Sequence, residues 1–157
     1  MTDAQFTAAL QAALAHFRAG NLWFHGAHHV TVGAGFQGDH KFYAKVYQQY
    51  EAEFDLMAEK AIAMAGVAMA SPQAVSARAA HIVSTMPAIA GLQGHTIGAA
   101  ALQVEKQTLT FIEKIFRDLE GGKRLSLGMN DFLAAAANAH ETNVYKLGQR
   151  ISGGQAG

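Results

Sequence analysis

The 157-residue chain has no cysteine, only two prolines and no excess of charge of either sign. Without cysteine it cannot form a disulfide, a zinc site built on thiolates or a cysteine nucleophile. Lys and Arg number 12, as do Asp and Glu, so the chain lacks the positive charge typical of proteins dominated by nucleic-acid contacts. No apolar run reaches the roughly 18 residues of a membrane-spanning helix, and residues 1–10 lack the basic start of a signal peptide. We expect a soluble protein of the cytoplasm.

Half of the residues are apolar, many of them alanine, and this composition favours helices. Apolar residues recur at helical spacing in four long stretches and one short one. The predicted helices cover residues 4–32, 40–64, 71–83, 95–119 and a last stretch, capped by Asn130 or Asp131, that runs to about residue 151. Residues 152–157 are expected to form a frayed tail.

Four long helices, with a short extra one between the second and the third, predict an all-α four-helix bundle. The connection over residues 66–94 is too long for a tight turn, so we expect it to cross the bundle. No linker or change of composition marks a boundary, and the length suits one core. Residues 1–157 are therefore expected to form a single domain.

The segment from Val30 to Gly38 matches a dinucleotide-binding fingerprint, because a β-branched run precedes Gly33, Gly35 and Gly38. A Rossmann domain needs several alternating strands, however, and no other segment resembles a buried strand. We interpret these glycines as a turn between the first two helices.

Histidine is concentrated near this turn, and two carboxylates follow it. Five of the eight histidines fall between positions 16 and 40, namely His16, His25, His28, His29 and His40. Asp55 and Glu59 are four residues apart on a predicted helix, so their carboxylates project from one face. Imidazole together with carboxylate suits divalent iron, zinc or manganese. Taken singly, each residue also fits a solvated surface, and Glu59 could pair with Lys60.

Other metal patterns are excluded. No Glu-x-x-His occurs, which removes the usual ligands of a di-iron site inside one bundle. His140-Glu141 lacks the second histidine at the spacing of a zinc protease, and no serine nucleophile elbow is present.

The positions of the ligands along the chain predict a site shared between subunits. In an antiparallel hairpin centred near Gly35, His28 and His40 lie at about the same level. Asp55 lies farther along the second helix, about 20 Å from the histidines at ~1.5 Å per residue. One subunit cannot bring the two pairs together. Two subunits related by a two-fold axis could, with two identical sites per dimer.

The same residues resemble the Dps miniferritins, the DNA-binding proteins of starved cells. That family carries a His, a Gly five residues later, a Phe eight later and a second His twelve later. After a further fifteen residues come Asp and, four on, Glu, in a stretch that reads roughly Asp-x-x-Ala-Glu-Arg and ends near a Gly. The matching residues here are His28, Gly33, Phe36, His40, Asp55, Ala58, Glu59, Lys60 and Gly66. The short helix opening at Ser71-Pro72 and the start of the last helix at Asn130-Asp131 are also similar.

The resemblance implies a ferritin-like bundle assembled into a hollow shell of twelve subunits, built from two-fold dimers. It implies a ferroxidase in which His28 and His40 of one subunit, and Asp55 and Glu59 of the other, bind iron. Fe(II) would be oxidised there by hydrogen peroxide or dioxygen, and Fe(III) would be stored in the cavity, which protects against oxidative stress. Zinc could occupy the same site. A second function of this family, coating DNA as a nucleoid structural protein, is the alternative.

Some residues depart from the family pattern. His29 stands where the family often has Trp, while Trp23 lies earlier, and Lys41 and Lys45 replace acidic residues at which mineral nucleates. His25, His29 and His81 are surplus histidines that could add or replace a ligand.

DNA binding is not expected to carry over. Residues 1–5 and 152–157 contain no Lys or Arg, so the mobile basic tail that supplies phosphate contacts is missing. Lys123-Arg124 is a small basic pair at a helix end. A plain helical bundle without metal is a third interpretation, which metal analysis would distinguish.

Overall fold

A computed structural model describes residues 1–152, which are almost entirely helical and contain no strand. The helices are α1 (Asp3–Val30), α2 (Phe36–Ala65), the short 3-10 helix η1 (Val67–Ala70), α3 (Pro72–Thr85), α4 (His95–Gly121) and α5 (Leu127–Ser152). The predicted all-α bundle, with a short helix between the second and third long ones, is confirmed. No helix within the described residues is both long and apolar enough to cross a membrane.

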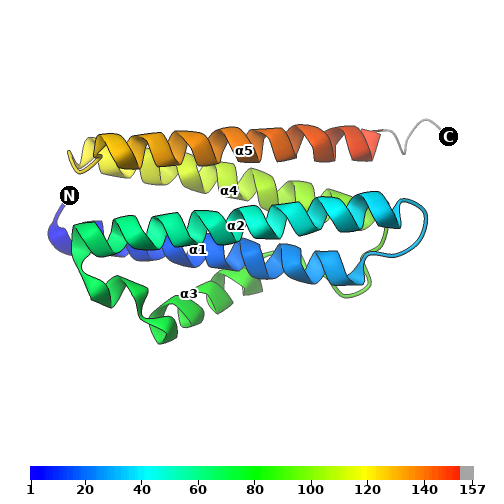
Figure 1. Ribbon diagram of the computed structural model, residues 1–157, viewed down its shortest axis with the longest axis horizontal. Coiled ribbons are helices and arrows are strands. Elements are labelled where there is room, and N and C mark those ends of the chain that lie inside the picture. The colour runs from blue at the N-terminus through cyan, green and yellow to red at the C-terminus, as the bar shows by residue number, and fades with distance from the viewer. Residues whose placement is uncertain (153–157) are drawn as a thin grey trace.

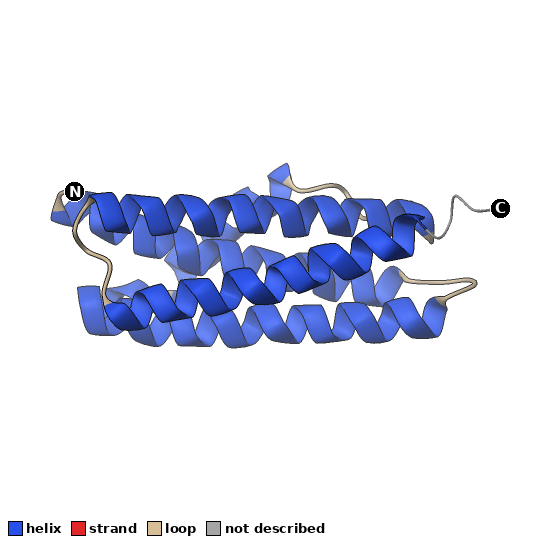
Figure 2. Ribbon diagram, turned by 90° about the horizontal axis from the view of Figure 1, so that it is seen from above, coloured by secondary structure: helices blue, strands red, loops and turns tan. Residues whose placement is uncertain are grey.

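The four long helices run side by side along the longest axis of the molecule (Figure 1). The helix α1 packs against α2, α3 and α4, and α4 packs against α5. The connection containing α3 returns the chain from the end of α2 to the start of α4 at the opposite end of the bundle (Figures 1 and 2). The bundle therefore consists of two antiparallel helix pairs joined by one long crossover, as the sequence predicts.

The apolar faces of these helices meet in a core that includes several fully buried aromatic rings. Phe17 and Phe24 of α1 and Tyr43 and Tyr50 of α2 are each no more than 1% exposed. Glycine is required at position 20, where a Cβ atom would overlap the ring of Tyr50. This close approach lets α1 and α2 pack tightly, and it positions Tyr50 over the centre of the bundle.

Two helix starts differ from the prediction. The helix α2 begins at Phe36 rather than His40, because Gly35 adopts the left-handed conformation (φ 88°) and its carbonyl oxygen already accepts from the Asp39 N–H. The helix α5 begins at Leu127, so Asn130 and Asp131 lie inside it and cap nothing. Its first turn is capped by Ser126, whose hydroxyl accepts from the Met129 N–H at 3.2 Å.

The other expected boundaries agree to within about two residues, which is the usual disagreement at helix ends. The glycines at 33 and 35 form the turn between α1 and α2, with φ of 84° and 88°. No strand precedes them within the described residues, so the interpretation as a turn is confirmed. Of the predicted tail, Ser152 is the last residue of α5, and residues 153–157 lie outside the described part.

Candidate metal centre

The turn between α1 and α2 brings His28 and His40 into direct contact. Their rings stack with centroids 3.7 Å apart. The Nδ1 atom of His28 donates to the backbone carbonyl of His40 at 2.9 Å, and Nδ1 of His40 donates to the carbonyl of His28 at 3.0 Å. Because a carbonyl oxygen only accepts, each Nδ1 carries the proton, and each Nε2 keeps a lone pair when the ring is neutral. Such backbone bonds are the usual way in which a protein orients metal-binding histidines.

Two aromatic side chains contact this pair, and an ion pair lies next to it. The ring of Phe36 stacks on His40 (centroids 4.9 Å apart), and Tyr47 meets His28 edge-on (5.5 Å). Next to His40, the buried Asp39 accepts two hydrogen bonds from Arg150, of 3.0 and 2.9 Å. The hydrogen bonds and charge of Asp39 raise the pKa of Arg150. This bidentate ion pair fastens the start of α2 to the end of α5 and so fixes the histidine end of the bundle.

Asp55 and Glu59 lie one turn apart on the solvent-exposed side of α2. Within residues 1–152 neither makes an ion pair or a side-chain hydrogen bond. The ammonium of Lys60 does not pair with Glu59 and instead lies over the ring of Phe132, 5.9 Å from its centroid. Both carboxylates are therefore free to bind a cation.

One chain does not join the histidine pair to the carboxylate pair. His40 and Asp55 belong to the same continuous helix, so their separation of 15 positions corresponds to about 22 Å along the axis. In the described part of the chain, no three His, Asp or Glu side chains are placed to share a metal ion. The separation therefore agrees with the estimate from the sequence.

A second polar cluster, which the sequence analysis missed, lies inside the bundle. His140 of α5 is bonded through Nδ1 to Glu105 of α4 at 2.7 Å and through Nε2 to Glu53 of α2 at 3.0 Å. Burial by itself lowers the pKa of His140, but the hydrogen bonds and charges of Glu105 and Glu53 outweigh it and raise the pKa to about 9. An imidazolium is therefore held between two carboxylates at neutral pH.

The cluster continues from Glu105 towards α1. Tyr50 has one hydroxyl proton and donates it to Glu105 (3.1 Å), so Thr108 donates to Tyr50 (2.7 Å) and His16 donates to Thr108 (3.0 Å). Burial, followed by the charge of His140, lowers the pKa of His16 to about 4, which keeps this ring neutral. Burial and the charge of Glu105 raise the pKa of Tyr50. Every fully buried side-chain nitrogen and oxygen among the described residues has a partner, so this network is closed.

One feature of the sequence could have indicated this cluster, namely that the carboxylate Glu53 falls on the helix face that carries the buried apolar residues. Glu53 lies three residues after Tyr50 and four before Met57, which are both fully buried. His140 and its two carboxylate partners come from three helices with unrelated spacing, so no motif joins them. The cluster contains no Glu-x-x-His, and both nitrogens of His140 are already bonded to carboxylates. It is a hydrogen-bonded network rather than a second di-iron centre.

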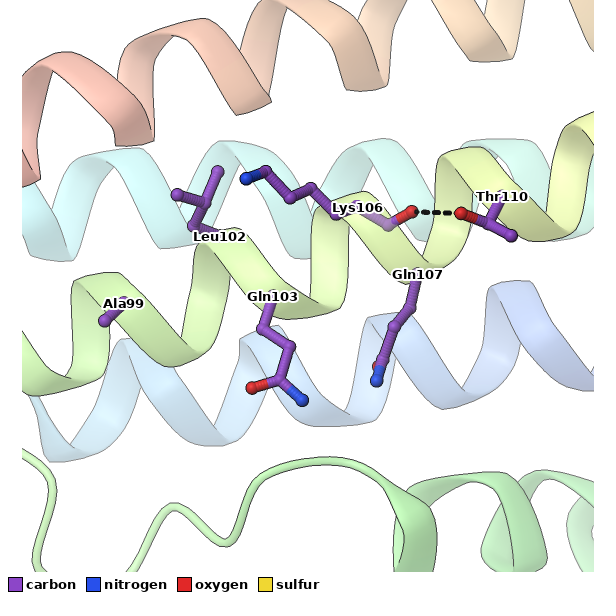
Figure 3. A pocket seen from close by; sticks show the side chains of 6 residues that line it. All are labelled: Ala99, Leu102, Gln103, Lys106, Gln107 and Thr110. Carbon is purple, nitrogen blue, oxygen red and sulfur yellow. Dashed lines mark hydrogen bonds between the residues drawn. The ribbon is translucent and has the colours of Figure 1, made fainter.

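A surface hollow along α4 does not contribute to the candidate centre. Its lining residues are Ala99, Leu102, Gln103, Lys106, Gln107 and Thr110. They lie on one helix, and the Thr110 hydroxyl donates to the backbone carbonyl of Lys106 at 3.1 Å (Figure 3). With neither imidazole nor carboxylate, this hollow lacks the ligands that iron requires.

No family model and no curated protein matches the sequence. Solved structures do match the fold. Dps from Bacillus brevis has a TM-score of 0.79 at 16% identity, covering 95% of this chain and 98% of that one. Dps from Thermosynechococcus elongatus has a TM-score of 0.78 at 18% identity, and the match covers 92% of this chain and 88% of that one. A C-terminal deletion mutant of Mycobacterium smegmatis Dps has a TM-score of 0.78 at 20% identity, and the match covers 96% of this chain and 99% of that one. The predicted resemblance is thus confirmed at the level of the fold.

Proposed function

We propose that this chain, which has the ferritin-like fold of the Dps proteins, is a miniferritin whose single domain spans residues 1–157. It binds Fe(II) at centres shared between two subunits, oxidises it with hydrogen peroxide or dioxygen, and stores Fe(III) inside a hollow shell of twelve subunits. The observation that carries this proposal is the arrangement of the two ligand pairs. His28 and His40 present two oriented imidazoles. Asp55 and Glu59 have no partner within residues 1–152, and they follow along the same helix, with Asp55 about 22 Å from His40.

A two-fold axis would bring these pairs together. Two antiparallel copies of α2 place His40 of one subunit beside Asp55 of the other if the axis crosses α2 midway between them, near Gln48. Asn21 of α1 donates a hydrogen bond to the Tyr47 carbonyl of α2 (2.9 Å), so this part of α1 lies at the same height in the bundle as the proposed axis. Leu22 lies there and is 50% exposed. An apolar side chain in this position supports a contact between two copies of the chain.

The two pairs would contribute different chemistry. Neutral imidazoles bind Fe(II) without adding charge, whereas the anionic carboxylates stabilise Fe(III) more strongly than Fe(II) and so favour oxidation. Two Fe(II) ions supply the two electrons that reduce one hydrogen peroxide to two water molecules, with uptake of two protons. The protein binds and orients the metal, and the ferric product leaves for the cavity.

The test is an anaerobic Fe(II) titration, followed by separate additions of hydrogen peroxide and air. We expect saturable Fe(II) binding before any oxidant is added, and then oxidation much faster than in protein-free buffer. The double variant Asp55→Asn, Glu59→Gln should lose the fast phase while keeping its helical content, because the shapes are retained and the anionic ligands are removed.

A matched control is Asp131→Asn, Glu141→Gln, which changes one exposed aspartate and one exposed glutamate on α5. This control should oxidise iron at the wild-type rate. If the Asp55, Glu59 variant retains the wild-type initial rate at low iron loading, the carboxylates of the centre lie elsewhere and the proposed site is wrong.

A further inference from the structure

Two more histidines lie beside the candidate iron ligands and are not needed by the proposed centre. His25 and His29 are one helical turn apart on α1, and both are exposed. Their ring centroids are 4.8 Å apart. The ring of His25 packs on Tyr47, 4.5 Å away and inclined by 33°. This contact limits the freedom of the His25 ring, and the helix fixes the spacing of the pair.

The nitrogens of this pair are not engaged elsewhere in the described chain. Neither His25 nor His29 makes a hydrogen bond or an ion pair within residues 1–152, whereas the Nδ1 atoms of His28 and His40 are bonded to carbonyls. The pair also lies in the last two turns of α1, which ends at Val30. The C-terminal end of a helix carries partial negative charge, and this favours a bound cation.

We propose that His25 and His29 form a second metal site, which binds Cu²⁺ through their two imidazole nitrogens and lies next to the iron ligand His28, whose ring centroid is 5.0 Å from that of His29. Histidines at positions i and i+4 of a helix present their rings on one face, which is the spacing that metal-binding helices use. Imidazole suits late first-row ions, and among these the affinity of a given nitrogen site is highest for Cu²⁺. Water would fill the remaining coordination positions.

The donor set distinguishes this site from the proposed iron centre. No third His, Asp or Glu of the described chain is placed to share an ion with the pair. The iron centre combines imidazole with carboxylate, and carboxylates are ligands for harder ions. A pair of imidazoles without carboxylate has no such preference for iron, so we expect Cu²⁺ to bind here far more tightly than Fe(II).

The experiment is a Cu²⁺ titration of the metal-free full-length protein, followed by electron paramagnetic resonance. We expect a bound Cu²⁺ whose spectrum shows coupling to two imidazole nitrogens. In the variant His25→Gln, His29→Gln, this species should be lost, with affinity at least tenfold lower. The variants His28→Gln, His40→Gln and His81→Gln, His95→Gln should retain it. His81 and His95 are exposed histidines on other helices and serve as the matched control.

Two results would overturn the assignment. One is unchanged Cu²⁺ binding in the His25, His29 variant. The other is loss of the copper species in the His28, His40 variant with retention in the His25, His29 variant, which would place copper on the proposed iron ligands. Circular dichroism of each variant checks that the helices persist. Because no iron is used, a failure of the proposed iron oxidation would leave this result unaffected.

Discussion

His140 and Glu105 meet at 2.7 Å in the centre of the bundle, where neither side chain has any contact with solvent. Glu53 bonds to the opposite nitrogen of the same ring at 3.0 Å. The ring is charged in the folded chain because its pKa is raised to about 9. The folded state therefore holds a proton at neutral pH that an unfolded histidine, with an ordinary pKa near 6.5, largely releases.

This bound proton predicts that stability falls as the solution becomes alkaline. The contribution of His140 is fully present below about pH 6.5 and is lost as the pH rises through about 9. Over the whole interval, the free energy of unfolding should fall by about 3 kcal/mol. Urea unfolding at a series of pH values and fixed protein concentration should show this decline, and His140→Gln should flatten it. A wild-type free energy of unfolding that stays level between pH 6.5 and 9 would contradict the assignment of the charge.

We predict that Glu105→Gln is strongly destabilising, because it leaves the fully buried His140 with only one carboxylate. Removing one partner of a buried charge pair costs about 3–5 kcal/mol in the free energy of unfolding. The control is Glu113→Gln on the same helix, where an exposed carboxylate pairs with the exposed Arg117 and the expected change is within about 0.5 kcal/mol. Equal unfolding midpoints for the two variants would show that the buried network contributes little.

Assembly can be tested at Leu22, which lies at the level of the proposed two-fold axis. The proposed shell of twelve chains of 16.7 kDa would have a mass of about 200 kDa. Leu22→Glu would place a charge against its own copy across the axis, so light scattering should show loss of the 200 kDa species. Leu22→Met, which keeps the apolar volume, should still assemble. A shell of unchanged mass in the glutamate variant would exclude Leu22 from the interface.

The helices could be predicted from the sequence, because apolar spacing and glycine breaks are local signals. The two wrong starts involve glycine. Gly38 resembles a helix breaker but lies in the first turn of α2. Gly128 likewise lies in the first turn of α5, just after the residue Ser126 that caps it. The sequence predicted that His28 and His40 lie at the same level of a hairpin. Their stacking and their bonds to each other's carbonyls depend on ring orientation, which spacing does not determine.

The buried network could not be predicted for a different reason. Glu53, Glu105 and His140 meet only because α2, α4 and α5 pack in one particular rotation about their axes. Sequence spacing defines the stripe of each helix that is buried, but it does not specify which residues of two stripes will touch. In the same way, a site divided between two subunits is complete in neither chain.

DNA retention is predicted to be absent at physiological salt. Arg124 of the small basic pair is engaged by Asp3 and lies 5.3 Å from the centre of the Phe6 ring. Few phosphates can then be neutralised, so any binding should fall steeply between about 50 and 200 mM salt. Gel retardation of plasmid DNA is the measurement. Stoichiometric co-migration at the higher salt would favour the alternative, a protein that coats DNA.

The proposed division of the iron centre between two subunits is tested most directly by complementation. One variant carries His28→Ala and His40→Ala, and the other carries Asp55→Ala and Glu59→Ala. Each alone should lack the fast phase of iron oxidation, because every shared centre loses half of its ligands. In a mixed dimer, one centre combines the intact histidines of one chain with the intact carboxylates of the other.

Random pairing makes about half of the dimers mixed, so roughly a quarter of all centres should be whole in co-expressed protein. The measurement is the fast rate of iron oxidation per subunit, with mixed preassembled shells of the two variants as the control. The account predicts recovery of about a quarter of the wild-type rate after co-expression and little recovery in the control. Co-assembled shells without any recovery would contradict a centre shared between subunits.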